Sequence, residues 1–226
     1  MDMGLKGKKV IVTAASKGLG KATALQFAYE GAHVMIASRD ENQLKQTSTE
    51  IKVLTGNDDV EYTVCDMTKL DEIQALVKRT VDIFGGVDVL INNSGGPPAG
   101  TFDDFQDDAW QSAFELNLLS FIRTIREVLP YMRAAGARHI VNLASSSFKQ
   151  PIDGLILSNT YRTAITGLAK SLSQELAKDN ILINTVGPGR IATERVEKLD
   201  QIQANKKGIT LEMARAQSEA EIPLQR

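Results

Sequence analysis

The stretch 8-KKVIVTAASKGLGKATALQFAYEGAHVMIAS-38 decides the fold. It begins as an apolar, β-branched run, passes through a turn containing Gly18 and Gly20, and continues as an amphipathic segment and a second apolar run. This pattern predicts a strand, a glycine turn, a helix and a strand. The helix is expected to bury four positions, Ala22, Leu25, Phe27 and Ala28. Such a unit is typical of dinucleotide binding, because the glycines let the backbone approach a pyrophosphate at the helix N-terminus.

The rest of the chain repeats the alternation of strand and helix. Strands are expected at 8–14, 33–38, 60–65, 87–92, 138–144 and 181–186, with amphipathic helical segments between them. This alternation predicts an α/β fold, a Rossmann-type doubly wound parallel sheet between two layers of helices. Ligands then bind at the carboxyl ends of the strands. His33 and His139 precede their strands and lie at the opposite edge, so we interpret them as structural or surface residues.

Composition narrows the function classes. The 226 residues suit one domain, and no linker, repeat or low-complexity block divides them. A net charge of −2, with 26 basic and 28 acidic residues interspersed, does not favour nucleic acid or an anionic membrane as a partner. Residues 1–10 lack a signal-peptide pattern and no apolar run has membrane-spanning length, which predicts a cytoplasmic protein. Cys65, the single cysteine, ends an apolar strand and is expected to be a buried, inert thiol.

Five motifs follow one another along the chain: 13-TAASKGLG-20, 92-NNSG-95, Asn117 in 115-ELNLLS-120, the serine strand 140-IVNLASS-146, and 181-ILINTVGPGRIAT-193. In this order they resemble the landmarks of the short-chain dehydrogenase/reductase family, including its 3-oxoacyl reductase-like members. In that family the first motif reads TGxxxGxG, so Ala14 stands at its first glycine, and the second motif reads NNAG. The resemblance covers essentially the whole chain. It implies an oxidoreductase that transfers hydride between a nicotinamide cofactor and a small carbonyl or alcohol substrate, with no metal.

The resemblance also implies a set of cofactor-binding residues. They are Thr13, Ala15, Ser16, Lys17, Gly18, Leu19, Gly20, Ser38, Arg39, Asp66, Met67, Asn93, Ser94, Gly95, Arg162, Pro188, Gly189, Ile191 and Thr193. Among them Asp66 matches the acid that contacts adenine in the family.

Charge favours NADP(H) over NAD(H). An NAD enzyme usually ends its second strand with a carboxylate for the ribose diol, whereas this chain has Ser38 followed by Arg39. Lys17 in the glycine turn faces the same side, so a 2′-phosphate would meet two cations and a hydroxyl. Asp40 is an acidic alternative to Arg39 as the residue that contacts the ribose, but it fits better as the N-cap of the next helix.

The catalytic positions depart from the family pattern. Asn117 and Ser145 match its asparagine and serine, but two anchors, Ser145 and 167-GLAKSL-172, place Ser158 and Arg162 on its YxxxK tyrosine and lysine. An alkyl hydroxyl ionises far less readily than a phenol, and a guanidinium stays protonated. Tyr161 lies three residues beyond the expected acid, so either its hydroxyl reaches the site or it packs as a helix aromatic.

Beyond Thr193, the resemblance implies a helical substrate lid over 194–222. The family's last helix and strand have no counterpart in the chain as given, and that strand helps to form the family's dimer interface, on which the expected homodimer or homotetramer depends. Three functions stay open: a reductase of a 3-oxoacyl thioester or similar ketone with an atypical proton donor, an NADP-binding sensor or pseudo-enzyme subunit, and a purely structural subunit.

Overall fold

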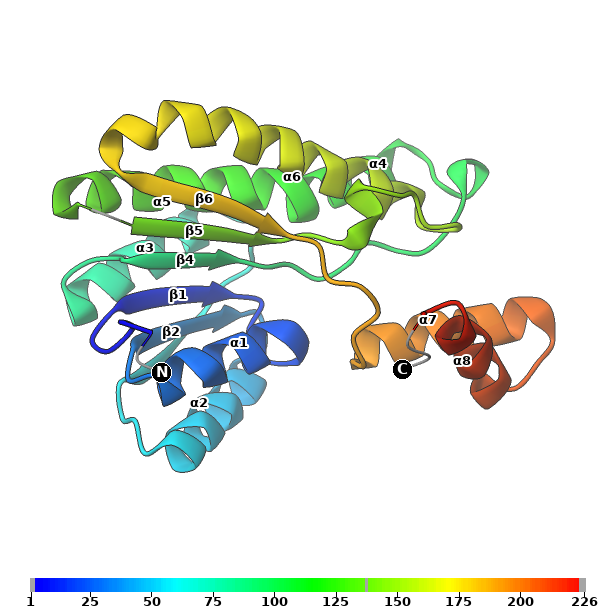
Figure 1. Cartoon of the computed structure of the whole chain (residues 1–226), viewed down its shortest axis with the longest axis horizontal. Coiled ribbons are helices and arrows are strands. Elements are labelled where there is room, and N and C mark those ends of the chain that lie inside the picture. Colours follow the sequence, from blue (N-terminus) through cyan, green and yellow to red (C-terminus); the bar gives the residue numbers. More distant parts are fainter. Residues whose placement is uncertain (1–2, 137, 224–226) are drawn as a thin grey trace. The chain divides into compact units, whose positions relative to one another are not determined.

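Six parallel strands form one sheet in the order β3-β2-β1-β4-β5-β6 in the computed structural model, which describes residues 3–136 and 138–223 (Figure 1). The strands are β1 (Lys9–Thr13), β2 (His33–Ser38), β3 (Val60–Val64), β4 (Val89–Asn92), β5 (Arg138–Leu143) and β6 (Ile181–Val186). They agree with the predicted ranges to within two residues at each end. The strand order reverses between β1 and β4, and a doubly wound sheet binds its ligand at such a point.

Helices cover both faces of this sheet, as predicted (Figure 1). One layer consists of α1 (Gly18–Tyr29) and α2 (Glu41–Thr55), and the other of α3 (Leu70–Phe84), α5 (Ser120–Ala135) and α6 (Ile156–Glu175). The shorter elements of this part are η1 (Phe102–Asp104), α4 (Asp107–Phe114), η2 (Glu115–Leu119), η3 (Ser146–Phe148) and η4 (Ala177–Asp179). Separate apolar cores fill the two interfaces between helices and sheet. The fold is therefore the three-layer, Rossmann-type one.

The predicted buried face of α1 needs correction at one position. The helix buries Gly20, Ala24 and Ala28, whereas Ala22 is exposed. Leu25 and Phe27 are partly buried and pack at the margin of the core. The small residues recur every four positions and therefore line one face, which lets the helix axis approach the sheet closely. The apolar pattern of the sequence therefore predicted the buried face in part from the wrong residues, since the small residues Gly20 and Ala24 were not among those expected.

The chain divides after Pro188 into two compact units. The second contains α7 (Glu194–Lys207) and α8 (Leu211–Ala220), which occupy most of the segment for which a helical lid is expected. Thr193 and Thr210 cap the two helices by accepting hydrogen bonds from Val196 N and Met213 N. Across 3–136 and 138–223, no helix is both long and apolar enough to cross a membrane.

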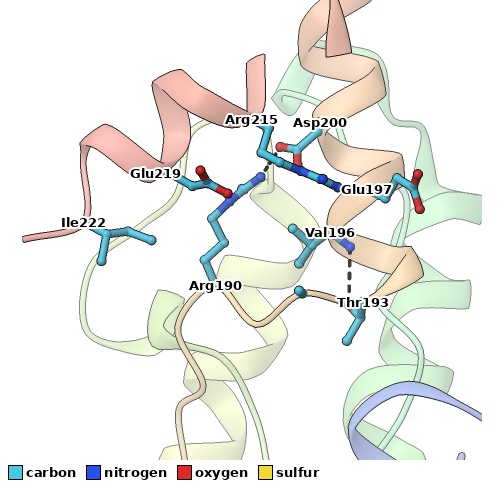
Figure 2. Close-up of a pocket in the computed structure, with 9 residues that line it drawn as sticks. Arg190, Thr193, Val196, Glu197, Asp200, Arg215, Glu219 and Ile222 are labelled. Atoms are coloured by element: carbon cyan, nitrogen blue, oxygen red, sulfur yellow. Dashed lines mark hydrogen bonds and ion pairs between the residues drawn. The ribbon is translucent and has the colours of Figure 1, made fainter. Parts of the chain in front are cut away.

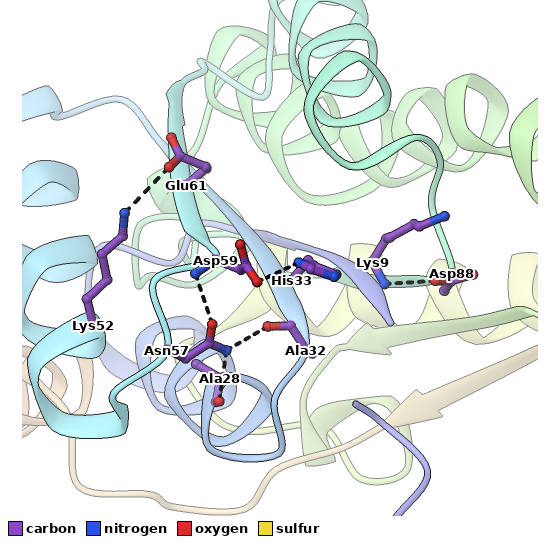
Figure 3. Close-up of polar contacts among 9 residues, drawn as sticks. All are labelled: Lys9, Ala28, Ala32, His33, Lys52, Asn57, Asp59, Glu61 and Asp88. Carbon is purple, nitrogen blue, oxygen red and sulfur yellow. Dashed lines mark hydrogen bonds and ion pairs between the residues drawn. The ribbon is translucent and has the colours of Figure 1, made fainter. Parts of the chain in front are cut away.

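The amino edge of the sheet, opposite the predicted site, contains both histidines. His33 Nδ1 lies 3.0 Å from an Asp59 oxygen (Figure 3), though not aligned as a hydrogen bond. The His33 ring also packs on Phe84. His139 is exposed at the start of β5. Neither histidine lies at the carboxyl edge, in agreement with their interpretation as structural or surface residues.

Asp88 ties three strands together at this edge. Its Oδ2 accepts a hydrogen bond of 2.8 Å from Lys9 N in β1 (Figure 3), and its Oδ1 lies 2.9 Å from Arg138 Nε in β5. Asp88 itself immediately precedes β4. Both side chains of the ion pair are largely buried, at 13% and 10% exposure. Removing one partner of such a pair leaves the other charge in a poorly solvated place.

We therefore expect Asp88→Ala to lower the free energy of unfolding by about 2–4 kcal/mol. Asp59→Ala is the matched control at the same edge, because that carboxylate is 60% exposed and should contribute less than about 1 kcal/mol. Urea denaturation followed by circular dichroism measures both. Equal losses in the two variants would contradict the structural role of Asp88.

Candidate functional site

The loops that follow β1, β2, β4 and β5 bring most of the predicted site residues to the carboxyl edge of the sheet. The glycine turn after β1 is fixed by a cross-strand polar contact. Thr13 Oγ1 donates to Asn93 O at 2.7 Å and accepts from Asn93 N at 2.8 Å, and Asn93 Nδ2 donates to Ala14 O. The first predicted cofactor loop is thereby locked to the NNSG loop.

Backbone geometry explains the residues of this turn. A Cβ on Gly20 would lie 2.5 Å from Ala14 O, so only glycine fits where α1 approaches the turn. Ala14, at the first glycine of the motif, has a φ of +47°, a conformation that L-residues rarely adopt. Helix α1 begins at Gly18 without a side-chain cap from Lys17, so its first amides are not capped by a side chain. A phosphate is a suitable partner for them.

A cavity of about 590 Å³ lies between the glycine turn and the end of β2. It is lined by Ser16, Lys17, Ser38, Arg39, Asp40 and Gln43. The Ser16 and Ser38 hydroxyls are 3.0 Å apart and join the two segments. Asp40 caps α2 by accepting from Gln43 N at 3.0 Å, as predicted. The cavity thus combines two cations and two hydroxyls with one carboxylate that is used in a helix cap.

Asp66 follows β3 in an ordered turn. Its Oδ1 accepts hydrogen bonds from the amide and hydroxyl of Thr68 at 2.9 and 2.8 Å. Burial acts to raise the pKa of this carboxyl, but the two Thr68 bonds and the charges of Arg39 and Lys69 outweigh it and lower the pKa below its usual value. Asp66 is therefore a negatively charged hydrogen-bond acceptor, and Arg39 lies close enough to stabilise its charge.

Cys65 takes no part in this site. The thiol is fully buried, and burial, followed by the charges of Glu72, Asp66 and Asp71, raises its pKa to about 12. Its hydrogen bond goes to the Sδ of Met67, itself buried, at 3.6 Å. A thiol with this pKa is protonated at neutral pH, which agrees with the expectation of an inert residue.

Asn117 lies in a π-helical segment, η2, between α4 and α5. Its Nδ2 donates to Ser94 Oγ at 2.9 Å and to Gly95 O at 2.7 Å, so it supports the NNSG loop. Its Oδ1 is buried without a hydrogen-bond partner among the described residues. An extra residue in a helical turn often marks a functional site, because it redirects side chains locally.

Ser145 follows β5 and caps the short helix η3. Its Oγ accepts from Ser147 N at 3.2 Å, which leaves the hydroxyl proton available to another acceptor. Ser146 N donates to Pro188 O at 3.1 Å, which ties this loop to the segment after β6. The Ser145 hydroxyl is half-buried at the carboxyl edge, where a substrate oxygen can reach it.

Helix α6 places Ser158 and Arg162 on one buried face, with 9% and 5% exposure. Arg162 donates to Leu143 O at 3.1 Å and to Ser94 O at 3.4 Å, and its guanidinium lies 5.8 Å from the centre of the Phe121 ring. The guanidinium thereby bridges the end of β5 and the loop after β4. Ser158 makes no side-chain hydrogen bond to any described residue.

Tyr161 lies on a different side of α6. Its hydroxyl donates to Trp110 O at 3.0 Å, and its ring packs against Trp110 and Phe114 from α4. Burial raises the pKa of its phenol, whereas an acid-base catalyst at neutral pH needs a lowered one. The contacts are those of an aromatic that joins two helices.

Two features of this region were not anticipated from the sequence. Asn159 donates to Ile152 O at 2.9 Å and accepts from Ile152 N at 3.2 Å, which fixes the loop before α6. Gly100 pairs with Leu155 in an isolated bridge, and Gly100 N donates to Gly154 O. The loop after β4 is thus bound to the loop before α6. An asparagine in a helical pattern gave no signal of this contact.

The last three predicted cofactor residues lie in the second unit. Gly189 and Ile191 precede α7, and Thr193 caps it. Over the described ranges, 3–136 and 138–223, no group of three or more His, Cys, Asp or Glu side chains is arranged to hold a metal ion.

Comparison with known proteins agrees with this architecture. The family model described as short chain dehydrogenase matches residues 8–204. The Bacillus subtilis oxidoreductase YvrD is 34% identical over 196 residues, which cover 87% of this chain and 73% of that protein.

Two solved structures share the fold closely. L-Sorbose reductase from Gluconobacter frateurii, complexed with NADPH and L-sorbose, superposes with a TM-score of 0.93 at 31% identity, over all of this chain and 86% of that one. A variant of actinorhodin polyketide ketoreductase, solved with NADPH, gives 0.93 at 30% identity with the same coverage. The glycine turn, the carboxyl-edge loops and the match over 8–204 together lead to one conclusion: the chain belongs to the short-chain dehydrogenase family.

Proposed function

We propose that this protein is an NADP-dependent short-chain oxidoreductase that acts on a small carbonyl or alcohol substrate, such as a 3-oxoacyl thioester or a similar ketone. One observation carries the proposal: an uncapped glycine-turn helix, a cavity with two cations and the Ser145 hydroxyl lie along the carboxyl edge of one sheet. A cytoplasmic location, expected from the sequence, and a homodimer or homotetramer, expected from the family resemblance, stay predictions.

The residues present fit a phosphorylated dinucleotide. The first amides of α1 and the glycines of the turn suit the pyrophosphate, and Asp66 suits an amino group of the adenine. Lys17 and Arg39, with the Ser16 and Ser38 hydroxyls, suit a 2′-phosphate. NADPH in both similar solved structures supports the same cofactor. When bound, the reduced nicotinamide supplies hydride to a carbonyl carbon.

The chain's own residues have separate roles in this proposal. Ser145 donates a hydrogen bond from its hydroxyl to the carbonyl oxygen of the substrate and so polarises it. Asn117 holds the 93–95 loop in place through Ser94 and Gly95. Arg162 donates hydrogen bonds to Ser94 in the same loop and to Leu143 at the end of β5. Its buried positive charge also favours the negative charge that develops on the substrate oxygen.

The proposed proton donor departs most from the family pattern. The Tyr161 hydroxyl is bonded to Trp110, which favours Ser158 as the residue in the position of the family's tyrosine. Ser158 is a weak acid, so proton delivery through Ser158 depends on a neighbouring water or a substrate hydroxyl. Because general acid–base help contributes about 10²–10⁴ in rate, this arrangement predicts slow rather than absent turnover.

The second candidate is an NADP-binding sensor or pseudo-enzyme subunit. It is favoured by one observation: the residue at the family's lysine position is bonded to the carbonyls of Leu143 and Ser94. In that case the site would keep its cofactor affinity and lose its chemistry. Turnover across a panel of carbonyl compounds separates the two functions.

Cofactor choice is the first test. We expect NADPH to bind at least about tenfold more tightly than NADH, which corresponds to about 1.4 kcal/mol. Fluorescence titration of the two cofactors measures the ratio, and the double variant Lys17→Ala, Arg39→Ala should abolish it while leaving NADH binding nearly unchanged. Equal affinities for NADPH and NADH in the native protein would refute the assignment of this cavity as the 2′-phosphate site.

The second test concerns the Ser145 hydroxyl. Ser145→Ala should reduce kcat for any carbonyl substrate by about two orders of magnitude or more, while the Kd for NADPH stays nearly the same, because this hydroxyl contacts the reacting oxygen and not the cofactor. Ser146→Ala is the matched control, since that neighbouring side chain is exposed. Similar kcat values for both variants would mean that the reacting oxygen binds elsewhere.

The third test separates the two candidate proton donors. Tyr161→Phe should lower kcat by less than about threefold, against the ~10²–10⁴ expected of a general acid, because its hydroxyl bonds Trp110. The double variant Ser158→Tyr, Arg162→Lys should raise kcat by restoring a phenol beside an ammonium group. Steady-state rates with saturating NADPH decide the matter. A loss of about a hundredfold in Tyr161→Phe would reverse the assignment.

A further inference from the structure

The second unit has a pocket of its own. It has a volume of about 380 Å³, within the usual range for small-molecule sites. Its lining comes from the segment before α7, from α7, and from α8 with the residues that follow it (Figure 2). The polar lining residues are Arg190, Thr193, Glu197, Asp200, Arg215 and Glu219, and the apolar ones are Ala192, Val196 and Ile222.

Asp200 is the unusual residue of this pocket. Its side chain is only 2% exposed, and its Oδ1 is hydrogen-bonded to Arg190 (Figure 2). Its Oδ2 is buried and has no hydrogen-bond partner among the described residues. A buried carboxylate oxygen without a donor is unfavourable, and such groups are normally satisfied by a protein donor, a water or a ligand. Oδ2 therefore calls for a donor supplied from the pocket.

The remaining charged side chains of the pocket are available for binding. Arg215, Glu197 and Glu219 make no side-chain hydrogen bond or ion pair with the described residues. The pocket lining contains two guanidinium groups and three carboxylates. Its net charge is therefore −1, which disfavours a simple anion as the ligand. A bare cation would face both guanidinium groups. A neutral ligand with several hydroxyls fits best, because each hydroxyl can donate to a carboxylate and accept from a guanidinium.

We propose that this pocket binds a polyhydroxylated small molecule, with one ligand hydroxyl donating to Asp200 Oδ2 and others contacting Arg215 and Glu219. All of these contacts lie within the second unit, so the site does not require the proposed reductase function.

Binding is tested on the full chain with D-sorbitol, a neutral polyol with no carbonyl group. Titration calorimetry should detect binding to the native protein, and Arg215→Met and Glu219→Gln should each weaken it by about fivefold or more. Lys206→Met, at an exposed position of α7 outside the pocket lining, removes the same charge as Arg215→Met and should leave affinity unchanged. Absent binding, or equal binding by all four proteins, would overturn the proposal.

A second arm tests the ligand class and separates this proposal from the proposed function. Glycine betaine and L-alanine serve as zwitterionic probes, and tighter binding of either one, lost in the same variants, would replace the polyol assignment. Sorbitol binding without any carbonyl reduction would sustain the pocket and refute the reductase. Carbonyl reduction without sorbitol binding would refute the pocket and sustain the reductase.

Discussion

The buried guanidinium of Arg162 is the interaction on which the arrangement of the site depends. It reaches from α6 to the carbonyls of Leu143, at the end of β5, and Ser94, in the loop after β4. Asn117 holds that loop from the other side, and Thr13 locks it to the glycine turn. Arg162 thereby joins α6 to the end of β5 and to the loop after β4 with one planar group.

Tyr161 lies on another side of the helix that carries Arg162. One turn of α6 carries Ser158 and Arg162 on its buried face, and Tyr161 is directed toward α4, where Trp110 and Phe114 pack against it. The bond to Trp110 joins α6 to α4, and Asn159 and Gly100 tie the adjacent loops together. The Ser145 loop has contacts of its own, because Ser147 N donates to Ser145 Oγ and Ser146 N donates to Pro188 O. A preorganised hydroxyl keeps much of its value for polarising a carbonyl even where the proton donor is weak.

Much of this architecture could be predicted from the sequence, because strand periodicity and glycine turns are local signals. The strands, the capping role of Asp40 and the inert Cys65 follow from their immediate neighbours. The buried face of α1 was predicted less well, since close packing of Gly20 and Ala24 depends on the sheet beneath them. The partners of Arg162 and Asn159 lie in other elements and in loops, so no periodic pattern reports them. The division after Pro188 likewise depends on contacts distant in sequence.

The central claim is that this site transfers hydride despite its altered proton donor. It is tested most directly by incubating the protein with NADPH deuterated at C4 of the nicotinamide and a panel of ketones, and by measuring deuterium at the new carbinol carbon by mass spectrometry. The account predicts one deuterium per product molecule from one of the two C4-labelled stereoisomers, formed slowly and lost in Ser145→Ala. Tight NADPH binding with no deuterated product from either stereoisomer, across all the ketones, would contradict it.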